Sequence, residues 1–241
     1  MFVISVFSVL VLSVANFSFL TILSVFSGLE NYSVSFSKSF DPDIKIKSLK
    51  GNTLYADDND LELISKTPGV VSVSKTILGK AVVQNDGKTE FAEIIGVDNE
   101  FENVILIDSI MQVGQFSKLD IYSSYTSSAI SERLNLTLYN MSGEFTVSTI
   151  SSDYLNFFLQ PFGNSQALIS NGVFKTRDNE NENKIIVSLP FASGLFSYEK
   201  NTYSELLLKT SGNSNAIKAK LKKLFPDFSI LTHKEQNETL Y

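Results

Sequence analysis

The stretch that decides the fold is LSVFSGLENYSVSFSKSFDPDIKI, residues 23–46. Upstream of Glu30 the chain carries no charged residue, whereas from Asp41 it changes to Asp-Pro-Asp and then to an alternation of isoleucine and lysine. A residue that precedes proline is pushed out of the α region, so a helix that enters this stretch ends at Asp41. Alternation with a period of two is typical of a strand with one buried face, so we expect a strand from Ile44.

The beginning of the chain is predicted to be a transmembrane helix over residues 1–27. Thirteen Val, Ile, Leu or Phe residues lie between Val3 and Ile22, and no charge interrupts them. Such a run favours insertion into a bilayer by roughly 4 to 8 kcal/mol. A signal peptide is the alternative, but the stretch lacks a basic start and an Ala-x-Ala cleavage pattern. The absent basic flank further predicts that the cytoplasmic start of the protein lies upstream of Met1.

Residues 28–41 are predicted to continue this helix as a stalk outside the membrane. A helix that runs to Phe40 would be about 60 Å long, against roughly 30 Å of hydrocarbon in a bilayer. Spacings of three and four residues place Phe26, Leu29, Ser33, Phe36 and Phe40 on one face. Apolar side chains beyond the membrane exit could contact lipid or a lipoprotein, or they could pack against a second membrane helix or a partner subunit. The candidate contact residues are Phe26, Leu29, Tyr32, Phe36 and Phe40.

The rest of the chain reads as two strand–helix–strand units that flank a different middle. The first unit contains a helix capped by Asp57, Asn59 or one of their neighbours, and a hairpin that turns at Asn85-Asp86-Gly87. The second contains an amphipathic helix within residues 213–225. The middle reads as short helices and strands, so we expect one α+β domain formed from both ends of the segment, with a β-rich insertion.

The chemistry that the sequence offers is sparse. A net charge of −6 and a pI near 4.9 disfavour nucleic-acid binding, and the absence of Cys excludes thiolate metal sites. His233 is the only histidine and is predicted to be a surface residue, while the acidic run after Ala56 is predicted to be a helix N-terminus rather than a calcium site. The lysines of residues 218–223 are predicted to be the solvated side of a helix, with anionic lipid as the alternative partner. The sequence therefore predicts no catalytic residue, no cofactor site, no metal site and no enzymatic activity.

The opening stretch closely resembles the junction between the first transmembrane helix and the periplasmic domain of FtsX/MacB-like ABC transporter permeases. The similarity is strongest to the lipoprotein-releasing LolC/LolE type of Bacteroidetes, in which a Ser-Phe-Asp-Pro-Asp motif corresponds to residues 39–43. It continues in ISKTPGVVSVSK, EIIGVD, IIVSLPFASGLF and the final HKEQNETLY, and so spans essentially the whole chain. The middle, SSAISERLNLTLYNMSG, departs from the glycine-rich pattern of the family.

The resemblance implies a MacB-like periplasmic core domain and a role in mechanotransmission. A porter subdomain would comprise residues 42–115 and 173–232, and residues 116–172 would form an inserted sabre-like subdomain. Residues 233–241 would begin a helix that leads to a second transmembrane helix outside this chain.

The family also implies where the protein works and with which partners. The chain would lie in the bacterial inner membrane, with the residues after about 28 in the periplasm. Its partners would be a separate cytosolic ATPase, a second permease subunit (identical or different), a lipoprotein substrate and a periplasmic carrier. The alternatives are a MacB-like efflux permease, an FtsX-like signalling permease, or a membrane-anchored sensor or binding domain.

Overall fold

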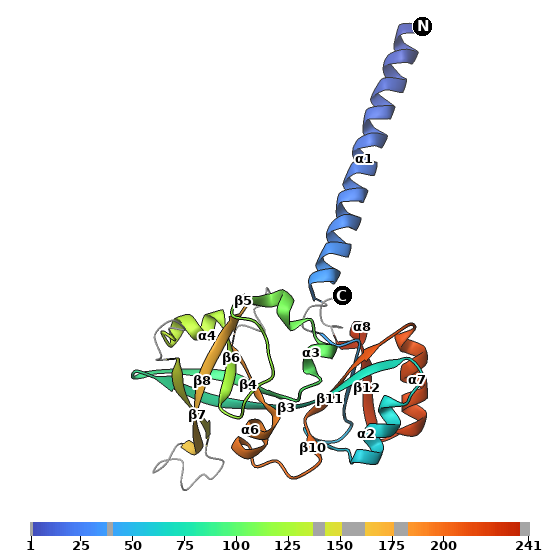
Figure 1. Cartoon of the computed structure of the whole chain (residues 1–241). Coiled ribbons are helices and arrows are strands. Elements are labelled where there is room, and N and C mark those ends of the chain that lie inside the picture. The colour runs from blue at the N-terminus through green and yellow to red at the C-terminus, as the bar shows by residue number, and fades with distance from the viewer. Residues whose placement is uncertain (1, 38–40, 137–142, 151–161, 176–182, 237–241) are drawn as a thin grey trace. The chain divides into compact units, whose positions relative to one another are not determined.

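A computed structural model describes residues 2–37, 41–136, 143–150, 162–175 and 183–236 (Figure 1). The chain separates into two compact units, residues 1–39 and residues 40–241. Each unit is described by itself below.

The first unit is the helix α1, Phe2–Ser37, of 36 residues. Within it, Ile4–Phe26 is the one described segment that is long and apolar enough to cross a membrane. Its polar side chains bond to the backbone one turn earlier: Ser8 to Ile4 and Asn16 to Leu12, both at 2.9 Å. Ser13 and Thr21 do the same. Because these polar groups form hydrogen bonds within the helix, the free-energy cost of placing them in an apolar surrounding is reduced.

In the second unit, an open sheet contains both ends of the domain (Figure 1). The strand β1, Ile44–Ser48, lies between β11, Glu205–Thr210, and β12, Phe228–Thr232, and is antiparallel to both. The long strand β3, Val70–Asn85, pairs with the other edge of β11. The two predicted strand–helix–strand units are therefore interleaved in one sheet.

Two helices, α2 (Asp58–Ser65) and α7 (Ser214–Leu224), pack on the same face of this open sheet. The apolar members of the alternation that begins at Ile44 are fully buried beneath them. Ile64 of α2 and Leu221 of α7 complete this core. Of the candidate caps of the first helix, the structure selects Asp57, whose carboxylate accepts from the amide of Asp60 at 2.8 Å.

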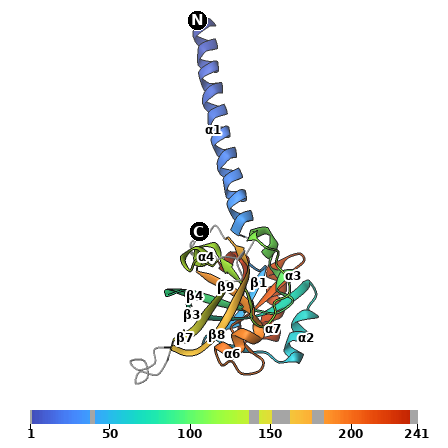
Figure 2. The ribbon, with the colours of Figure 1, turned by 60° about the vertical axis from the view of Figure 1, so that its left-hand side comes forward.

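Six of the described strands close into a ring by their pairing. From β3 the pairing runs through β4 (Lys88–Val97), β9 (Lys184–Ser188), β6 (Ser123–Ser127), β8 (Phe162–Phe174) and β7 (Glu144–Ile150), and then returns to β3. Figure 2 labels five of these strands, β3, β4, β7, β8 and β9. Two helices, α4 (Ser128–Arg133) and α6 (Leu189–Leu195), add side chains to its apolar core. The hairpin between β3 and β4 turns at Asp86 and Gly87, both at positive φ, as predicted.

The remaining described elements are short. They are β2 (Leu54–Tyr55), which pairs with β10 (Thr202–Tyr203), α3 (Phe101–Val104), a 3-10 helix (Ile107–Ile110), β5 (Met111–Val113) and α8 (His233–Gln236). Strands from the predicted insertion pair with β3 and β9 of the flanking parts. The predicted subdomain boundaries after residues 115 and 172 stay a prediction.

Two motifs that are far apart in the sequence meet where α6 packs on the ring. A Cβ atom placed on Gly96 of EIIGVD would lie 2.2 Å from the Cβ of Ala192 in SLPFASGLF. A Cβ atom on Gly79 would lie 2.3 Å from the ring of Phe196. The missing side chains of these two glycines let the helix approach the strands.

We expect Gly96→Ala to destabilise the domain by about 1–3 kcal/mol, because the new methyl group overlaps Ala192. Urea unfolding measures this change. Gly194→Ala, on α6 itself, is the matched control, since its Cβ would meet only the Gln166 side chain at 4.0 Å and alanine favours a helix. Equal destabilisation by the two substitutions would contradict the close-packing explanation, and Ala192→Gly should partly rescue Gly96→Ala.

Candidate functional site at the paired chain ends

The predicted contact residues on the stalk are placed only in part. Phe26 lies at the end of the apolar segment of α1 and is 69% exposed as a residue. Leu29, Tyr32 and Phe36 lie on α1, but their side chains are outside the described part of the structure. Phe40 lies outside the described residues. Their role in lipid, lipoprotein or helix contact therefore stays a prediction.

The described site nearest to the stalk in sequence is the place where the domain begins and ends. Strands β1 and β12 are antiparallel neighbours, and Ile44 pairs with Thr232. One residue further out, the amide of His233 donates to the carbonyl of Asp43 at 3.1 Å. The first strand after the stalk and the last strand before α8 are thus joined at their outer ends, and we call this place the end junction.

The Asp-Pro-Asp motif supplies one side of the end junction. The carboxylate of Asp43 accepts from the amide of Thr210 at 2.8 Å, which joins the start of β1 to the end of β11. The carbonyl of Pro42 accepts from the Gln236 amide group at 3.2 Å. Asp41 lies 3.8 Å from the imidazole of His233. The motif therefore holds three segments together. Its predicted role in ending the stalk helix stays a prediction, because α1 is described as far as Ser37 and residues 38–40 lie outside the described residues.

His233 differs from its predicted position. The sequence predicts a surface residue because no second histidine or cysteine accompanies it, but the side chain is only 21% exposed and faces Asp41. The reason is its place directly after β12, where the pairing with β1 carries it into the junction.

Glu235 closes the other side of the end junction. Its carboxylate accepts from Lys218 of α7 and, at 2.8 Å and 2.9 Å, from the amide and hydroxyl of Thr232. The bond from Lys218, followed by the bond from the Thr232 amide, lowers the pKa of Glu235 to about 2. Lys222 likewise donates to the carbonyl of Phe228 at 2.7 Å. Two of the α7 lysines therefore have partners within the domain, and part of the β12 edge is occupied.

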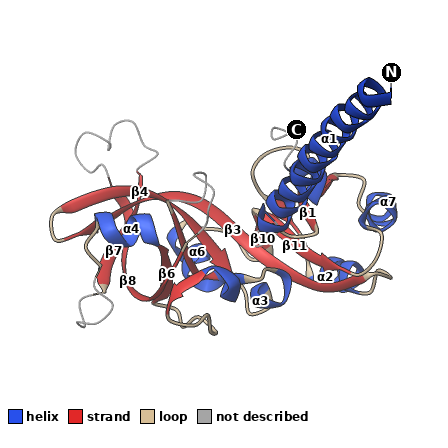
Figure 3. Cartoon of the chain, turned by 90° about the horizontal axis from the view of Figure 1, so that it is seen from above, coloured by secondary structure: helices blue, strands red, loops and turns tan. Residues whose placement is uncertain are grey.

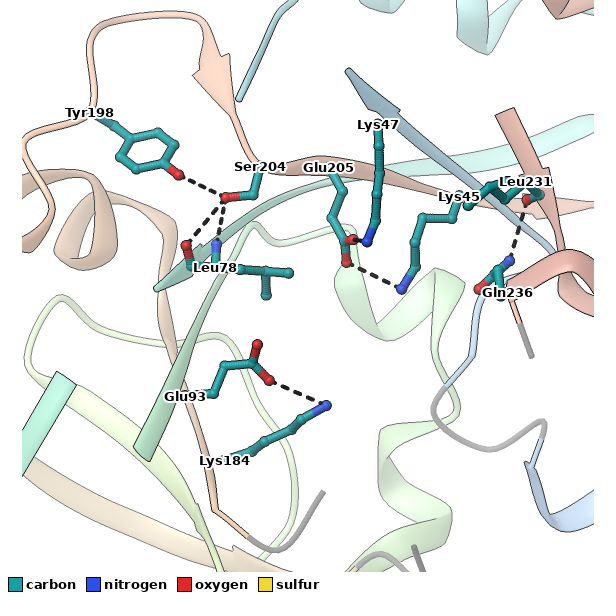
Figure 4. A network of polar contacts seen from close by, with 10 residues as sticks. All are labelled: Lys45, Lys47, Leu78, Glu93, Lys184, Tyr198, Ser204, Glu205, Leu231 and Gln236. Atoms are coloured by element: carbon teal, nitrogen blue, oxygen red, sulfur yellow. Dashed lines mark hydrogen bonds and ion pairs between the residues drawn. The ribbon is translucent and has the colours of Figure 1, made fainter. Parts of the chain in front are cut away.

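Towards the opposite end of β1, a buried carboxylate joins β1 to β11 (Figure 4). Glu205 is only 4% exposed, and its two oxygens lie 3.5 Å from Lys45 and 3.3 Å from Lys47. A buried charge is tolerated when it is paired. The lysines of the Ile-Lys alternation, which the sequence assigns to the solvent face, thus neutralise a carboxylate from the neighbouring strand.

The contacts described at the end junction are hydrogen bonds and ion pairs between segments of the domain. Among the described residues, no group of three His, Cys, Asp or Glu side chains could hold a metal ion. A cavity of about 440 Å³ lies between the end of β4 and residues 116–121. Asp98 lines this cavity. Its carboxylate accepts from the Ser74 hydroxyl at 2.7 Å and from the amide of Lys75 at 3.1 Å, so it ties the end of β4 to β3.

Comparison with known proteins identifies the fold. No protein-family model matches the sequence, and a sequence search among curated proteins finds no significant match. Among solved structures, the periplasmic region of MacB from Actinobacillus actinomycetemcomitans matches with a TM-score of 0.55 at 14% identity, over 85% of this chain and 94% of that chain. The domain has the MacB periplasmic fold. The predicted fold class, α+β after one apolar N-terminal helix, is thereby confirmed.

Two further structures share this fold. The extracellular domain of the noncanonic ABC-type transporter YknZ from Gram-positive bacteria matches with a TM-score of 0.53 at 12% identity, over 78% of this chain and 99% of that chain. A domain of a candidate permease protein from Porphyromonas gingivalis matches with a TM-score of 0.52 at 12% identity, over 83% of this chain and 93% of that chain.

We expect the end junction to weaken in acid. Because the pKa of Glu235 falls from its ordinary 4.5 to about 2 on folding, its contribution to stability is complete above pH 4.5 and is lost as the pH falls towards 2. Glu235→Gln and Lys218→Met should each flatten the dependence of the urea midpoint on pH across this interval. A variant that loses as much stability between these pH values as the unmodified protein would contradict the assignment.

Proposed function

We propose that this chain is the anchor and extracytoplasmic domain of a permease subunit of an ABC transporter. The observation that carries the proposal is the combination of a membrane-length apolar helix with a MacB-like domain in the same chain. The sources of the matching domains support it, since they include MacB, an ABC-type transporter and a candidate permease.

In this proposal the chain transmits movement and is not itself an enzyme. A separate cytosolic ATPase subunit hydrolyses ATP, and α1 carries the displacement into the domain. The displacement reaches β1 first, then passes through the backbone pairing and the Glu205 ion pairs to β11, and from there to β3 and the ring. A second permease subunit, identical or different, completes the transporter.

The proposed substrate is a lipoprotein that is extracted from the bacterial inner membrane and passed to a periplasmic carrier. The resemblance of residues 23–46 to the LolC/LolE junction supports this, as do the apolar residues predicted on one face of the stalk. MacB-like efflux and FtsX-like signalling share the same fold and are the alternatives. A membrane-anchored sensor or binding domain is an alternative of another class.

Photo-crosslinking from the stalk tests the substrate. With a photoreactive amino acid at Leu29 or Phe36 of the full protein in its native membrane, we expect an adduct with a lipoprotein, because these side chains line the proposed acyl path. Ser35, on another face of the helix, is the matched control and should give little adduct. Adducts with another permease helix alone would favour the packing role and would argue against a lipoprotein path on this face.

A change in the stiffness of the stalk helix tests the proposed mechanism. Replacing residues 33–35 of α1 by three glycines should reduce transport severalfold while ATP hydrolysis continues, because each glycine costs about 1 kcal/mol of helix stability relative to alanine. Three alanines at the same positions keep the helix and should preserve transport. Transport that survives the glycines would contradict mechanotransmission through α1, whatever the substrate.

A further inference from the structure

The strand β3 belongs to both parts of the domain (Figure 3). On one edge, its last pair with β11 is Thr76 with Glu205, and its first pair with β7 is Ala81 with Thr149. Among the described strands, none pairs with residues 77–80 on this edge. The open sheet therefore changes into the ring across four residues of a single strand.

The side chain of Ser204 bridges part of this gap (Figure 4). Its hydroxyl accepts from the amide of Leu78 at 2.8 Å and lies 3.4 Å from the carbonyl of the same residue, to which it donates. One serine thus satisfies both backbone groups that a neighbouring strand would otherwise satisfy. Ser204 directly precedes β11 and is 9% exposed, so this bond ties β3 to the open sheet.

A second bond connects the same hydroxyl to the ring. The phenol of Tyr198 lies 2.9 Å from the Ser204 hydroxyl, and the Tyr198 side chain packs against the apolar core of the ring. The backbone holds Tyr198 in place, since its amide donates to the carbonyl of Ser193 in α6 at 2.9 Å. Ser204 and Tyr198 therefore join the open sheet to the ring through one side-chain contact.

The two sides of β3 at this point differ in how they are held. Leu78 packs into a core that combines Leu207 of the open sheet with Ile95 and Tyr125 of the ring. The next residue, Gly79, faces the ring of Phe196 and has no side chain of its own to interlock. One side is thus fixed by extensive apolar packing. The other is held by Leu189 of α6, which packs against the cores of both the ring and the open sheet, by the contact of Gly79 with Phe196, and by the Ser204–Tyr198 bond.

We infer that residues 77–80 of β3 form a hinge between the open sheet and the ring, and that the Ser204–Tyr198 contact is the latch that holds it closed. The apolar core around Leu78 stays packed and is the point about which the two parts turn. While the latch is made, the ring follows β11 as one body; when it is broken, the ring turns about β3. The inference concerns the bending of the domain and does not depend on the transported substrate.

Two measurements on the full chain in lipid nanodiscs test the hinge separately from transport. Because the chain contains no cysteine, spin labels can be placed at Lys88→Cys on the ring hairpin and at Lys220→Cys on α7, both of which are exposed. The distance distribution between the labels reports the bend, and hydrogen exchange at the Leu78 amide reports the Ser204 bond.

The two latch variants should give different results. Ser204→Ala should widen the distance distribution and also raise exchange at Leu78 roughly three- to tenfold, the effect of one lost hydrogen bond. Tyr198→Phe should widen the distribution while exchange at Leu78 stays within about twofold of the unmodified protein, because Ser204 still bonds to Leu78.

Ser148→Ala is the matched control, since Ser148 is buried in β7 and bonds at 2.9 Å to Ser165 within the ring. It should change neither readout. If Ser204→Ala fails to fold, Tyr198→Phe alone decides the matter. A distance distribution that stays as narrow in Tyr198→Phe as in the unmodified protein would overturn the latch.

Discussion

The antiparallel pairing of β1 with both β11 and β12 is the constraint on which the rest of the domain depends. It joins residues that are more than 150 positions apart, so the domain cannot form until both ends of the segment have been made. The pairing also fixes which face of β1 is buried, because a shift of one residue would exchange Ile44 and Ile46 for the two lysines. The ion pairs of Lys45 and Lys47 with Glu205 add a second penalty against that shift.

Three glycines at contacts between layers have a common physical role. Gly69 in ISKTPGVVSVSK adopts a φ of +102°, and a Cβ atom there would lie 2.7 Å from Ile217 of α7. Gly96 admits Ala192, and Gly79 admits the ring of Phe196. In each case a helix, or the residue that follows one, approaches a strand, or for Gly69 the turn directly before a strand, more closely than any side chain would allow. These glycines therefore mark close contacts between layers.

Local patterns in the sequence predict the parts of this fold that local forces determine. The apolar run predicts α1, the Asn-Asp-Gly turn predicts the β3–β4 hairpin, and the acidic cap predicts the start of α2. Strand β6 escapes prediction because Ser123–Ser127 is polar, although Ser124 and Thr126 are fully buried and bond within the domain. The closure of the ring, the burial of Glu205 and the Ser204 bridge arise from pairs distant in the chain, and no periodicity encodes them.

The position of the end junction makes the resistance of the domain to force depend on direction. Asp43 and His233 lie at the same end of neighbouring strands, so a force that separates the two chain ends would open the β1–β12 ladder one bond at a time. A force that pulls both ends in the same direction, parallel to the strands, instead loads all the β1–β11 hydrogen bonds at once. The ion pair of Lys45 with the buried Glu205 adds to the resistance between these two strands. The domain is thus mechanically anisotropic, compliant to splaying of its ends and stiff to their joint displacement.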